Sequence, residues 1–269
     1  MVAEPDVAER ADGEREMSSE RGASPTASRR RARAVSFDFG QTIAGIDNDL
    51  LMQKLGRLGV ASTAGDLETA SRIAWGAYDA AVRAGVAGHP WKLFMRTFLE
   101  NGLVPRPSAD EIERAVDALW DDQPKVNLWR RALPDMIELV KELRSAGIPH
   151  AILSNSEGRL LELITEMGIL DLFPIVGDSG RLGVEKPDPR MFHWAAEKLN
   201  VDISELVHVG DSLGADVEGA ERAGAHGIWF RATSLGMSVA EVKVSKPPLI
   251  ATTAAELRAH LATFGLFGG

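Results

Sequence analysis

The sequence has no cysteine among its 269 residues, which excludes disulfides, cysteine nucleophiles and thiolate metal sites. It has no apolar run close to the roughly 20 residues that span a membrane. It also lacks an excess of positive charge. The formal net charge is −9, so a general surface for nucleic acid or anionic membrane is not expected. These absences predict a cytoplasmic protein without nucleic-acid or membrane partners, and we expect it to work as a monomer or homodimer.

Large apolar residues are almost missing from residues 1–33. This segment holds seven acidic and seven basic side chains, and it cannot bury enough surface to offset the entropy lost on ordering. Its arginine run, RRRAR at 29–33, is followed only by the short segment AVSF before Asp38. A signal peptide needs a longer apolar core. We therefore predict a disordered, solvated tail without a targeting segment.

From Ala34 onward, short apolar runs alternate with segments of helical periodicity. The expected strands are 34–39, 150–155, 174–177, 206–210, 226–230 and 248–252. The expected helices among them are 134–147, 189–200, 215–224 and 254–264. Nearly all-apolar strands separated by single helices are typical of a parallel sheet covered on both faces. The pattern predicts an α/β fold with a doubly wound, Rossmann-like sheet.

Residues 47–124, between the first two expected strands, are helical in pattern and too long for one crossover. Helices are expected at 50–59, 67–85, 90–102 and 109–120. We expect an α-helical cap domain at 47–124, inserted into a core domain made of 34–46 and 125–269. Four aromatic residues of the insert are expected to form its core, with a place in the substrate pocket as the alternative for any one of them. They are Trp75, Tyr78, Trp91 and Phe94.

Polar residues gather at the carboxyl ends of the expected strands, where doubly wound sheets bind their ligands. They are Asp38, Ser154, Asn155, Lys186, Asp211 and Asp216. In this set Asp38 would attack phosphorus and form an aspartyl-phosphate. Mg²⁺, which prefers oxygen ligands, would bind between Asp38 and Asp211. Ser154 and Lys186 would hold the phosphate oxygens, so the set suits phosphoryl transfer to an aspartate.

Four segments carry a more specific signal because they occur in a characteristic order. They are SFDFGQTI (36–43), ILSNS (152–156), GVEKPDPRMF (183–192) and VGDSLGADVEGAERAG (209–224). Together they resemble the motifs of the haloacid dehalogenase superfamily of hydrolases, in the branch with a helical cap after the first strand. The resemblance implies catalytic roles for Asp38, the nucleophile, and Lys186, which neutralises the phosphate. It implies substrate binding by Thr42, Ser154, Asn155 and Lys186. It also implies a Mg²⁺ site made of Asp38, the backbone carbonyl of Gly40, Asp211 and Asp216.

Gly40 is a departure from that family pattern. It stands where the resemblance implies a second aspartate, whose carboxyl group protonates the leaving oxygen and later activates water. General acid–base help is worth typically about 10²–10⁴ in rate. We therefore expect a Mg²⁺-dependent phosphatase for a small phosphorylated metabolite, with a modest rate or a preference for good leaving groups. Alternatively a cap residue supplies the proton, with Lys54, Lys92, Arg72 and His89 as the candidates.

Two further functions stay open at this stage. Relatives that cleave carbon–halogen or carbon–phosphorus bonds also work without the second aspartate, so such a specificity is one alternative. The other is a catalytically weak protein that binds a phosphorylated ligand or a protein partner.

Two motifs of unrelated enzymes also occur in the chain. Asp38-Phe39-Gly40 matches the magnesium element of protein kinases, but only a polar tail precedes it, so the glycine-rich loop and lysine strand are missing. The segment GDSLG at 210–214 matches the nucleophile elbow of serine hydrolases, but the chain after it is too short for the acid and histidine with their strands. The histidines, His208 among them, fall at unrelated spacings and are interpreted as packing or surface residues.

Overall fold

The computed structural model describes residues 31–86, 90–235, 237 and 247–267. The tail predicted at 1–33 lies outside the described residues except for its last three. Six parallel strands form one sheet in the order β10-β9-β8-β1-β6-β7. Their bounds are β1 Ala34–Phe37, β6 His150–Ser154, β7 Val176–Asp178, β8 Leu206–Gly210, β9 His226–Phe230 and β10 Leu249–Ala251. Every predicted strand is present, and the predicted α/β class with a parallel sheet is confirmed.

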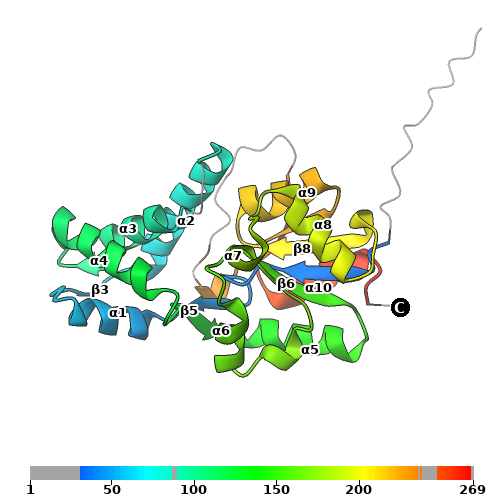
Figure 1. Ribbon diagram of the computed structural model, residues 1–269, viewed down its shortest axis with the longest axis horizontal. Coiled ribbons are helices and arrows are strands. Elements are labelled where there is room, and N and C mark those ends of the chain that lie inside the picture. The colour runs from blue at the N-terminus through cyan, green and yellow to red at the C-terminus, as the bar shows by residue number, and fades with distance from the viewer. Residues whose placement is uncertain (1–30, 87–89, 236, 238–246, 268–269) are drawn as a thin grey trace, which may run out of the picture.

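Helices cover both faces of this sheet (Figure 1). Because side chains alternate along a strand, Val35 and Phe37 of β1 pack in one apolar cluster and Ala34 in another. The first cluster includes residues of α5 (Pro134–Ser145) and α10 (Ala254–Thr263). The second includes residues of α8 (Pro189–Lys198) and α9 (Glu218–Ala223). The shorter elements of this part are α6 Leu160–Glu166, η1 Leu170–Leu172, α7 Ser179–Leu182, η2 Ile203–Glu205 and η4 Thr233–Leu235.

The segment between β1 and β6 forms a second, helical lobe beside the sheet (Figure 1). Its elements are α1 Asn48–Arg57, β3 Thr63–Ala64, α2 Leu67–Arg83, α3 Trp91–Gly102, β4 Leu103–Val104 and α4 Ala109–Asp122. The four helices match the predicted ones to within a few residues. Aromatic rings pack α2 on α3, and the rings of Trp75 and Phe94 have centroids 4.3 Å apart. None of the described helices is both long and apolar enough to cross a bilayer.

Two short strands carry the chain into and out of this lobe. β2 (Ala44–Ile46) pairs with β5 (Trp129–Ala132) in antiparallel fashion. The sequence analysis did not predict this pair, because three or four residues are too few to show a period of two. The pair has a direct effect on the site, since β5 begins with Trp129.

Candidate active site

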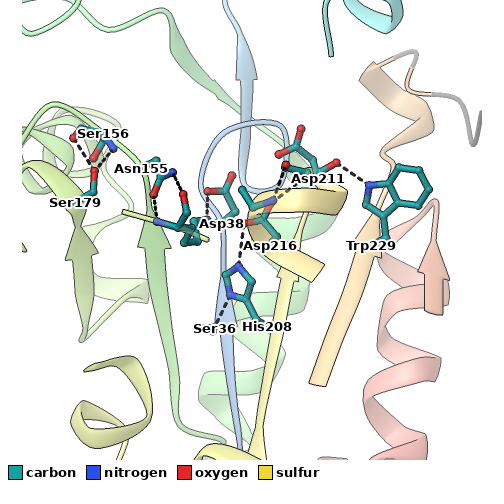
Figure 2. Close-up of polar contacts among 12 residues, drawn as sticks. Ser36, Asp38, Asn155, Ser156, Ser179, His208, Asp211, Asp216 and Trp229 are labelled. Carbon is teal, nitrogen blue, oxygen red and sulfur yellow. Dashed lines mark hydrogen bonds and ion pairs between the residues drawn. The ribbon is translucent and has the colours of Figure 1, made fainter. Parts of the chain in front are cut away.

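The carboxyl ends of three strands lie side by side, because β1 pairs with β6 on one side and β8 on the other. The strand order reverses between β1 and β8, which is where doubly wound sheets bind ligands. Asp38 directly follows β1, Ser154 is the last residue of β6, and Asp211 directly follows β8. Figure 2 shows Asp38 and Asp211 together at this edge. The structure thus brings together residues that are more than 100 positions apart in sequence, such as Asp38 and Ser154.

Lys186 is fixed beside Asp38 by Asn155. The Asn155 Nδ2 donates to the Lys186 carbonyl at 2.7 Å, and the Lys186 backbone N–H donates to Asn155 Oδ1 at 2.7 Å. The Lys186 Nζ then donates to Asp38 Oδ1 at 2.7 Å and to Asp216 Oδ1 at 2.6 Å. Asn155 was predicted to bind substrate. In the structure it lines the cavity, and its side-chain amide is engaged with the backbone of Lys186.

Asp216 accepts hydrogen bonds from three directions. Besides Lys186, the donors are His208 Nε2 at 3.0 Å and the Ser212 backbone N–H at 2.9 Å. A carboxylate only accepts, so the Nε2 of His208 carries the proton and its Nδ1 accepts from the Ser36 hydroxyl at 2.8 Å. Burial lowers the pKa of His208, so this ring is neutral at physiological pH. The chain Ser36–His208–Asp216, visible in Figure 2, fixes the carboxylate from below the sheet edge.

The backbone around Asp216 departs from the regular helix predicted at 215–224. Leu213–Val217 form a π-helical turn, η3, and the α-helix α9 starts only at Glu218. Ser212 caps this turn by accepting from Ala215 N–H at 3.1 Å. A Cβ at Gly210 would lie 2.2 Å from the Cγ of Asp216. Glycine is therefore required at position 210 for the carboxylate to lie against the end of β8.

The charges of these groups follow from burial and from one another. Burial raises the pKa of Asp38 to about 6, although the neighbouring Lys186 opposes the shift. Burial disfavours ionisation of Asp216 too, but the ammonium of Lys186 and the hydrogen bond from His208 hold its pKa below the usual range. Burial would lower the pKa of Lys186, yet Asp216 and Asp38 together raise it above its ordinary value. Near neutral pH the ion triad of Lys186 with two carboxylates is therefore charged.

The acidic cluster fits a hard divalent cation. Carboxylate oxygens of Asp38, Asp211 and Asp216 lie within 4.8 Å of one another. Within the described residues, Asp211 Oδ2 is buried without a hydrogen-bond partner. Burial, with the charges of Asp38 and Asp216, raises the pKa of Asp211 well above its ordinary value. A cation that prefers oxygen ligands, such as Mg²⁺, would supply the missing partner and relieve the repulsion. Gly40 lines the same cavity.

A cavity of about 230 Å³ adjoins Asp38 and separates the sheet edge from the helical lobe. Its sheet side is polar and includes Ser154, Asn155, Ser156, Glu157, Ser179, Glu185, Lys186 and Ser212. Its lobe side is aromatic and includes Trp75, Tyr78, Trp91, Trp120 and, from β5, Trp129. The site therefore combines a polar, charged end with an aromatic, apolar end.

Trp129 occupies the space beside Gly40. A Cβ built on Gly40 would lie 3.1 Å from the Cδ1 and 3.2 Å from the Nε1 of the Trp129 indole, which is tighter than normal packing. The indole thus lies where a longer side chain at position 40 would start. The small residue at position 40 and the large residue at position 129 therefore go together, because the indole uses the space beside the glycine.

Several predicted residues lie away from the cavity. Thr42 is buried and is not among the lining residues. Lys54 donates to Asp122 on α4 and to the Val126 carbonyl, and Lys92 pairs with Asp117 on the lobe surface. Arg72 is exposed, and His89 lies outside the described residues. Besides Asp38, Asp211 and Asp216, the acids that line the cavity are Glu157 and Glu185, whose pKa values burial raises.

The sequence analysis missed other contacts of the site. Asp79 on α2 accepts from the Ser212 hydroxyl at 2.5 Å, and burial raises its pKa to about 6. Gln123, which directly follows α4, and Glu157 also line the cavity. Three of the four aromatic residues expected in the lobe core also line the cavity, and Phe94 does not. The sequence signal that could have drawn attention to this aromatic lining is its six tryptophans. Four of them line this one cavity.

The nucleophile-elbow interpretation gains no support. Ser212 donates to Asp79 and caps η3, and no histidine is among its hydrogen-bond partners in the described part of the chain. The histidine that does lie near an aspartate and a serine is His208, and both it and Ser36 are fully buried.

Comparison with known proteins gives a consistent result. A family model described as haloacid dehalogenase-like hydrolase matches residues 32–224. A mouse protein named haloacid dehalogenase-like hydrolase domain-containing protein 3 is 31% identical over 137 residues, which are 51% of this chain and 53% of that protein. The glyceraldehyde 3-phosphate phosphatase of Methanopyrus kandleri is 40% identical over 92 residues, which are 34% of this chain and 40% of that enzyme. The chain spans about half the length, or less, of these curated relatives.

The fold has counterparts among solved structures. The crystal structure of a phosphatase from Thermococcus onnurineus, from the same superfamily, covers 85% of this chain and 97% of its own with a TM-score of 0.54. The identity is 23%, so this likeness shows a shared fold.

Proposed function

The chain belongs to the haloacid dehalogenase-like hydrolase family, and from this premise we propose that it is a Mg²⁺-dependent phosphatase for a small phosphorylated molecule. The observation that supports the proposal most is the position of Lys186. Its Nζ lies 2.7 Å from Asp38 Oδ1, beside two further buried carboxylates and at the polar end of a cavity. A nucleophile, a fixed cation and a hard-metal site together suit phosphoryl transfer. The curated relatives named as phosphatases support the same reaction class.

In the proposed first step, Asp38 attacks the phosphorus of the substrate. A bond forms between its carboxylate oxygen and phosphorus while the ester P–O bond breaks, and the alcohol leaves with the electron pair. Water then attacks the aspartyl-phosphate, releasing phosphate and restoring the carboxylate. Asp38 suits this role because it lies at the cavity with a pKa of about 6, so it is mostly ionised at neutral pH. A bound Mg²⁺ would neutralise part of the phosphate charge as a Lewis acid.

The remaining residues position the phosphate group and neutralise its charge. Lys186 faces the reacting oxygens with a full positive charge, which favours the charge that builds up in the transition state. Ser154, at the end of β6, offers its hydroxyl to the phosphate, while Asn155 holds Lys186 through its backbone. Asp38, Asp211 and Asp216 supply the oxygens for Mg²⁺, with the Gly40 carbonyl as a further ligand in the proposal. Thr42, predicted to bind substrate, is buried and does not line the cavity, so its role in the proposal is to support the loop after Asp38.

The lack of an acid at position 40 bears on the rate. Without it, about 10²–10⁴ of rate enhancement is missing for substrates with poor leaving groups. Lys54, Lys92 and Arg72 do not compensate, because each points its charge elsewhere. We propose that residues 47–124 act as the cap that encloses the substrate. The expectations of a cytoplasmic location, a monomer or homodimer, and no nucleic-acid or membrane partner belong to the same proposal.

The reaction is tested by trapping the intermediate. The protein is incubated with Mg²⁺ and a panel of phosphate esters, then quenched with borohydride, which reduces an aspartyl-phosphate to homoserine. Mass spectrometry should find homoserine at position 38 in the wild type and not in Asp38→Asn, and phosphate release should stop in the same variant. Circular dichroism checks that the variant folds. Phosphate release that persists in Asp38→Asn refutes the proposal.

The alternative specificities have their own readouts in the same experiment. Chloride release from 2-chloropropionate, or phosphate release from phosphonates only, would replace the phosphatase with a carbon–halogen or carbon–phosphorus hydrolase. If phosphorylated ligands bind but are not turned over and no intermediate is trapped, the protein functions in ligand binding and not in catalysis.

A further inference from the structure

The apolar end of the cavity is a tryptophan cluster contributed by several elements. Trp75 comes from α2, Trp91 from α3, Trp120 from α4 and Trp129 from β5. Trp91 is in contact with two of the others, with ring centroids 5.3 Å from Trp120 and 6.4 Å from Trp129. Such tilted, non-stacked rings leave faces for a further flat ring. We call these four side chains the tryptophan cluster.

The lobe side of the cavity offers no charge to a second anionic group. Among the lining residues in the described part of the chain, Lys186 is the single lysine and there is no arginine. Lys186 is already committed to Asp38 and Asp216 at the opposite end. A substrate whose alcohol part carries a carboxylate or second phosphate would therefore find no cation there. The uncharged part of the substrate must match aromatic faces.

The tryptophan cluster also has unused hydrogen-bond donors. The Nε1 atoms of Trp75, Trp91 and Trp129 are buried and have no acceptor among the residues that the structure describes. An indole N–H can only donate, and a buried donor without a partner destabilises the protein. An acceptor atom on the ligand would recover part of this cost. Among the three, the Nε1 of Trp129 is beside Gly40, two residues from the nucleophile.

The chemistry at position 40 restricts the leaving group independently of the cluster. No carboxylic acid can protonate the leaving oxygen from Gly40, and Trp129 fills that space. An indole N–H can hydrogen-bond an oxygen but does not transfer its proton near neutral pH. Without a proton donor at position 40, next to the nucleophile, substrates whose alcohol leaves as a stable anion are favoured. Phenols and enols do so, whereas aliphatic alcohols do not.

The aromatic lining and the lack of an acid at position 40 favour the same kind of substrate. We propose that the cavity takes the phosphate monoester of a phenol or an enol. Its flat ring contacts the tryptophan cluster and carries a hydrogen-bond acceptor. The proposal rests on the proposed phosphatase function. The phosphate lies against Lys186 and the acidic cluster, and the ring extends directly from it toward Trp91 and Trp120. Proton transfer to the leaving group is then unnecessary. The Asp38 oxygen bonds to phosphorus, the P–O bond breaks, and the phenolate or enolate departs with the electron pair.

The recognition step can be measured without turnover. Binding of phenylphosphonate and cyclohexylphosphonate is compared by calorimetry in Mg²⁺ buffer, because neither ligand has a leaving group and only the ring differs. We expect phenylphosphonate to bind at least about tenfold tighter, in keeping with about 0.5–1.5 kcal/mol for each aromatic pair. 4-Acetylphenylphosphonate, which adds an acceptor, should bind tighter still. Equal affinity for the two rings, or a preference for 2-(trimethylammonio)ethylphosphonate, overturns the proposal.

Matched variants connect the preference to the cluster. Trp120→Leu should reduce the phenyl preference to less than about threefold, and Trp120→Phe should restore it, because a ring face returns. Trp194→Leu is the control, since Trp194 lies on α8 outside the cavity. It should keep the full preference. A loss in both leucine variants would indicate a general structural effect and refute the assignment to the cluster.

Turnover provides a second, separate measurement. Across phenyl phosphates of decreasing phenol acidity, kcat/KM should fall steeply and reach its lowest value for alkyl phosphates. Trp120→Leu should raise KM for phenyl phosphate with little change in kcat. If no ester is hydrolysed while phenylphosphonate still binds selectively, the phosphatase function fails and the ring site stands. If esters are hydrolysed without any preference for a ring, the phosphatase function stands and the ring site is refuted.

Discussion

The indole of Trp129 lies beside Gly40, two residues after Asp38. A Cβ on Gly40 would lie 3.1 Å from the Trp129 Cδ1, so a side chain at position 40 would press against the indole unless the ring shifts by a few tenths of an ångström. We therefore expect an aspartate at position 40 to be accommodated best together with a smaller residue at position 129.

Gly40→Asp alone should cost roughly 1–3 kcal/mol of stability, because it overpacks against the indole, and it should give no gain in turnover. The double variant Gly40→Asp/Trp129→Leu makes room for the carboxyl group. It should hydrolyse alkyl phosphates at least about tenfold faster than Trp129→Leu, out of the 10²–10⁴ that such catalysis can supply. Phosphate release and thermal denaturation measure the two effects. Equal gains in the single and double variants would show that the contact is unimportant.

Mg²⁺ should stabilise the protein against unfolding, because it offsets the repulsion among Asp38, Asp211 and Asp216. At about 100 times the dissociation constant the gain is about 2.7 kcal/mol, or roughly 5–10 °C in Tm for a chain of this size. Scanning calorimetry with Mg²⁺ and with EDTA measures it. Asp211→Asn is the matched variant. Its Tm in EDTA should equal or exceed that of the wild type, and its Mg²⁺ shift should disappear. An undiminished shift would place the cation elsewhere.

Asp79 should make stability depend on pH in an unusual direction. Burial raises its pKa to about 6, above the unfolded value of about 3.9. The folded state therefore binds the proton more tightly, so this contribution to stability is complete below pH 4 and is lost as pH rises through 6. Because Asp79 is only partly buried by exposed area, the loss is roughly 2 kcal/mol rather than the full shift.

Asp79→Asn removes this loss. The difference in unfolding free energy between the variant and the wild type should shift in favour of the variant by roughly 2 kcal/mol from pH 4.5 to pH 7.5. Urea denaturation at both pH values measures it. Asp66→Asn at the start of the same helix is the control with the opposite sign, since hydrogen bonds from Thr69 lower the pKa of Asp66. The same sign in both variants would contradict the assignment.

Gly210→Ala should disrupt the site by displacing the Asp216 carboxylate. The new methyl group would lie 2.2 Å from the Asp216 Cγ, so the carboxylate must leave Lys186 or the strand must shift. We expect a loss of about 1–3 kcal/mol in stability and at least about 100-fold in kcat, since the ion triad moves and, with it, Asp216 as a proposed metal ligand. Gly76→Ala is the control, because Gly76 is exposed on α2 and a Cβ there meets nothing within 4 Å. It should stabilise by about 0.5–1 kcal/mol. Comparable losses in both would show that the Asp216 contact is not the cause.

The sequence predicted the sheet and the polar residues at its edge for a physical reason. Short apolar runs mark strands, and in a parallel sheet the residues that follow them, such as Asp38 and Asp211, necessarily lie at one end. Lys186 needed the family resemblance as well. It lies in a loop with no period of its own, and Asn155 positions it through contacts 31 residues away.

The contacts between the lobe and the sheet could not be predicted. Whether Trp129 contacts Gly40, or Asp79 contacts Ser212, depends on how two separately patterned parts of the chain pack, and Asp79 and Ser212 are 133 residues apart. The spacing of His208 gave no sign of a role, because its partner Ser36 lies 172 residues earlier in an adjacent strand. The same limit explains Lys54, which charge alone made a candidate and which packing directs to Asp122.

The concentration of tryptophan around one cavity gives the protein a built-in optical reporter. Four of its six indoles line the cavity, so most of the intrinsic fluorescence of the chain should respond to whatever enters there. Occupancy of the cavity and any movement of the helical lobe against the sheet can therefore be followed in real time on the unlabelled protein.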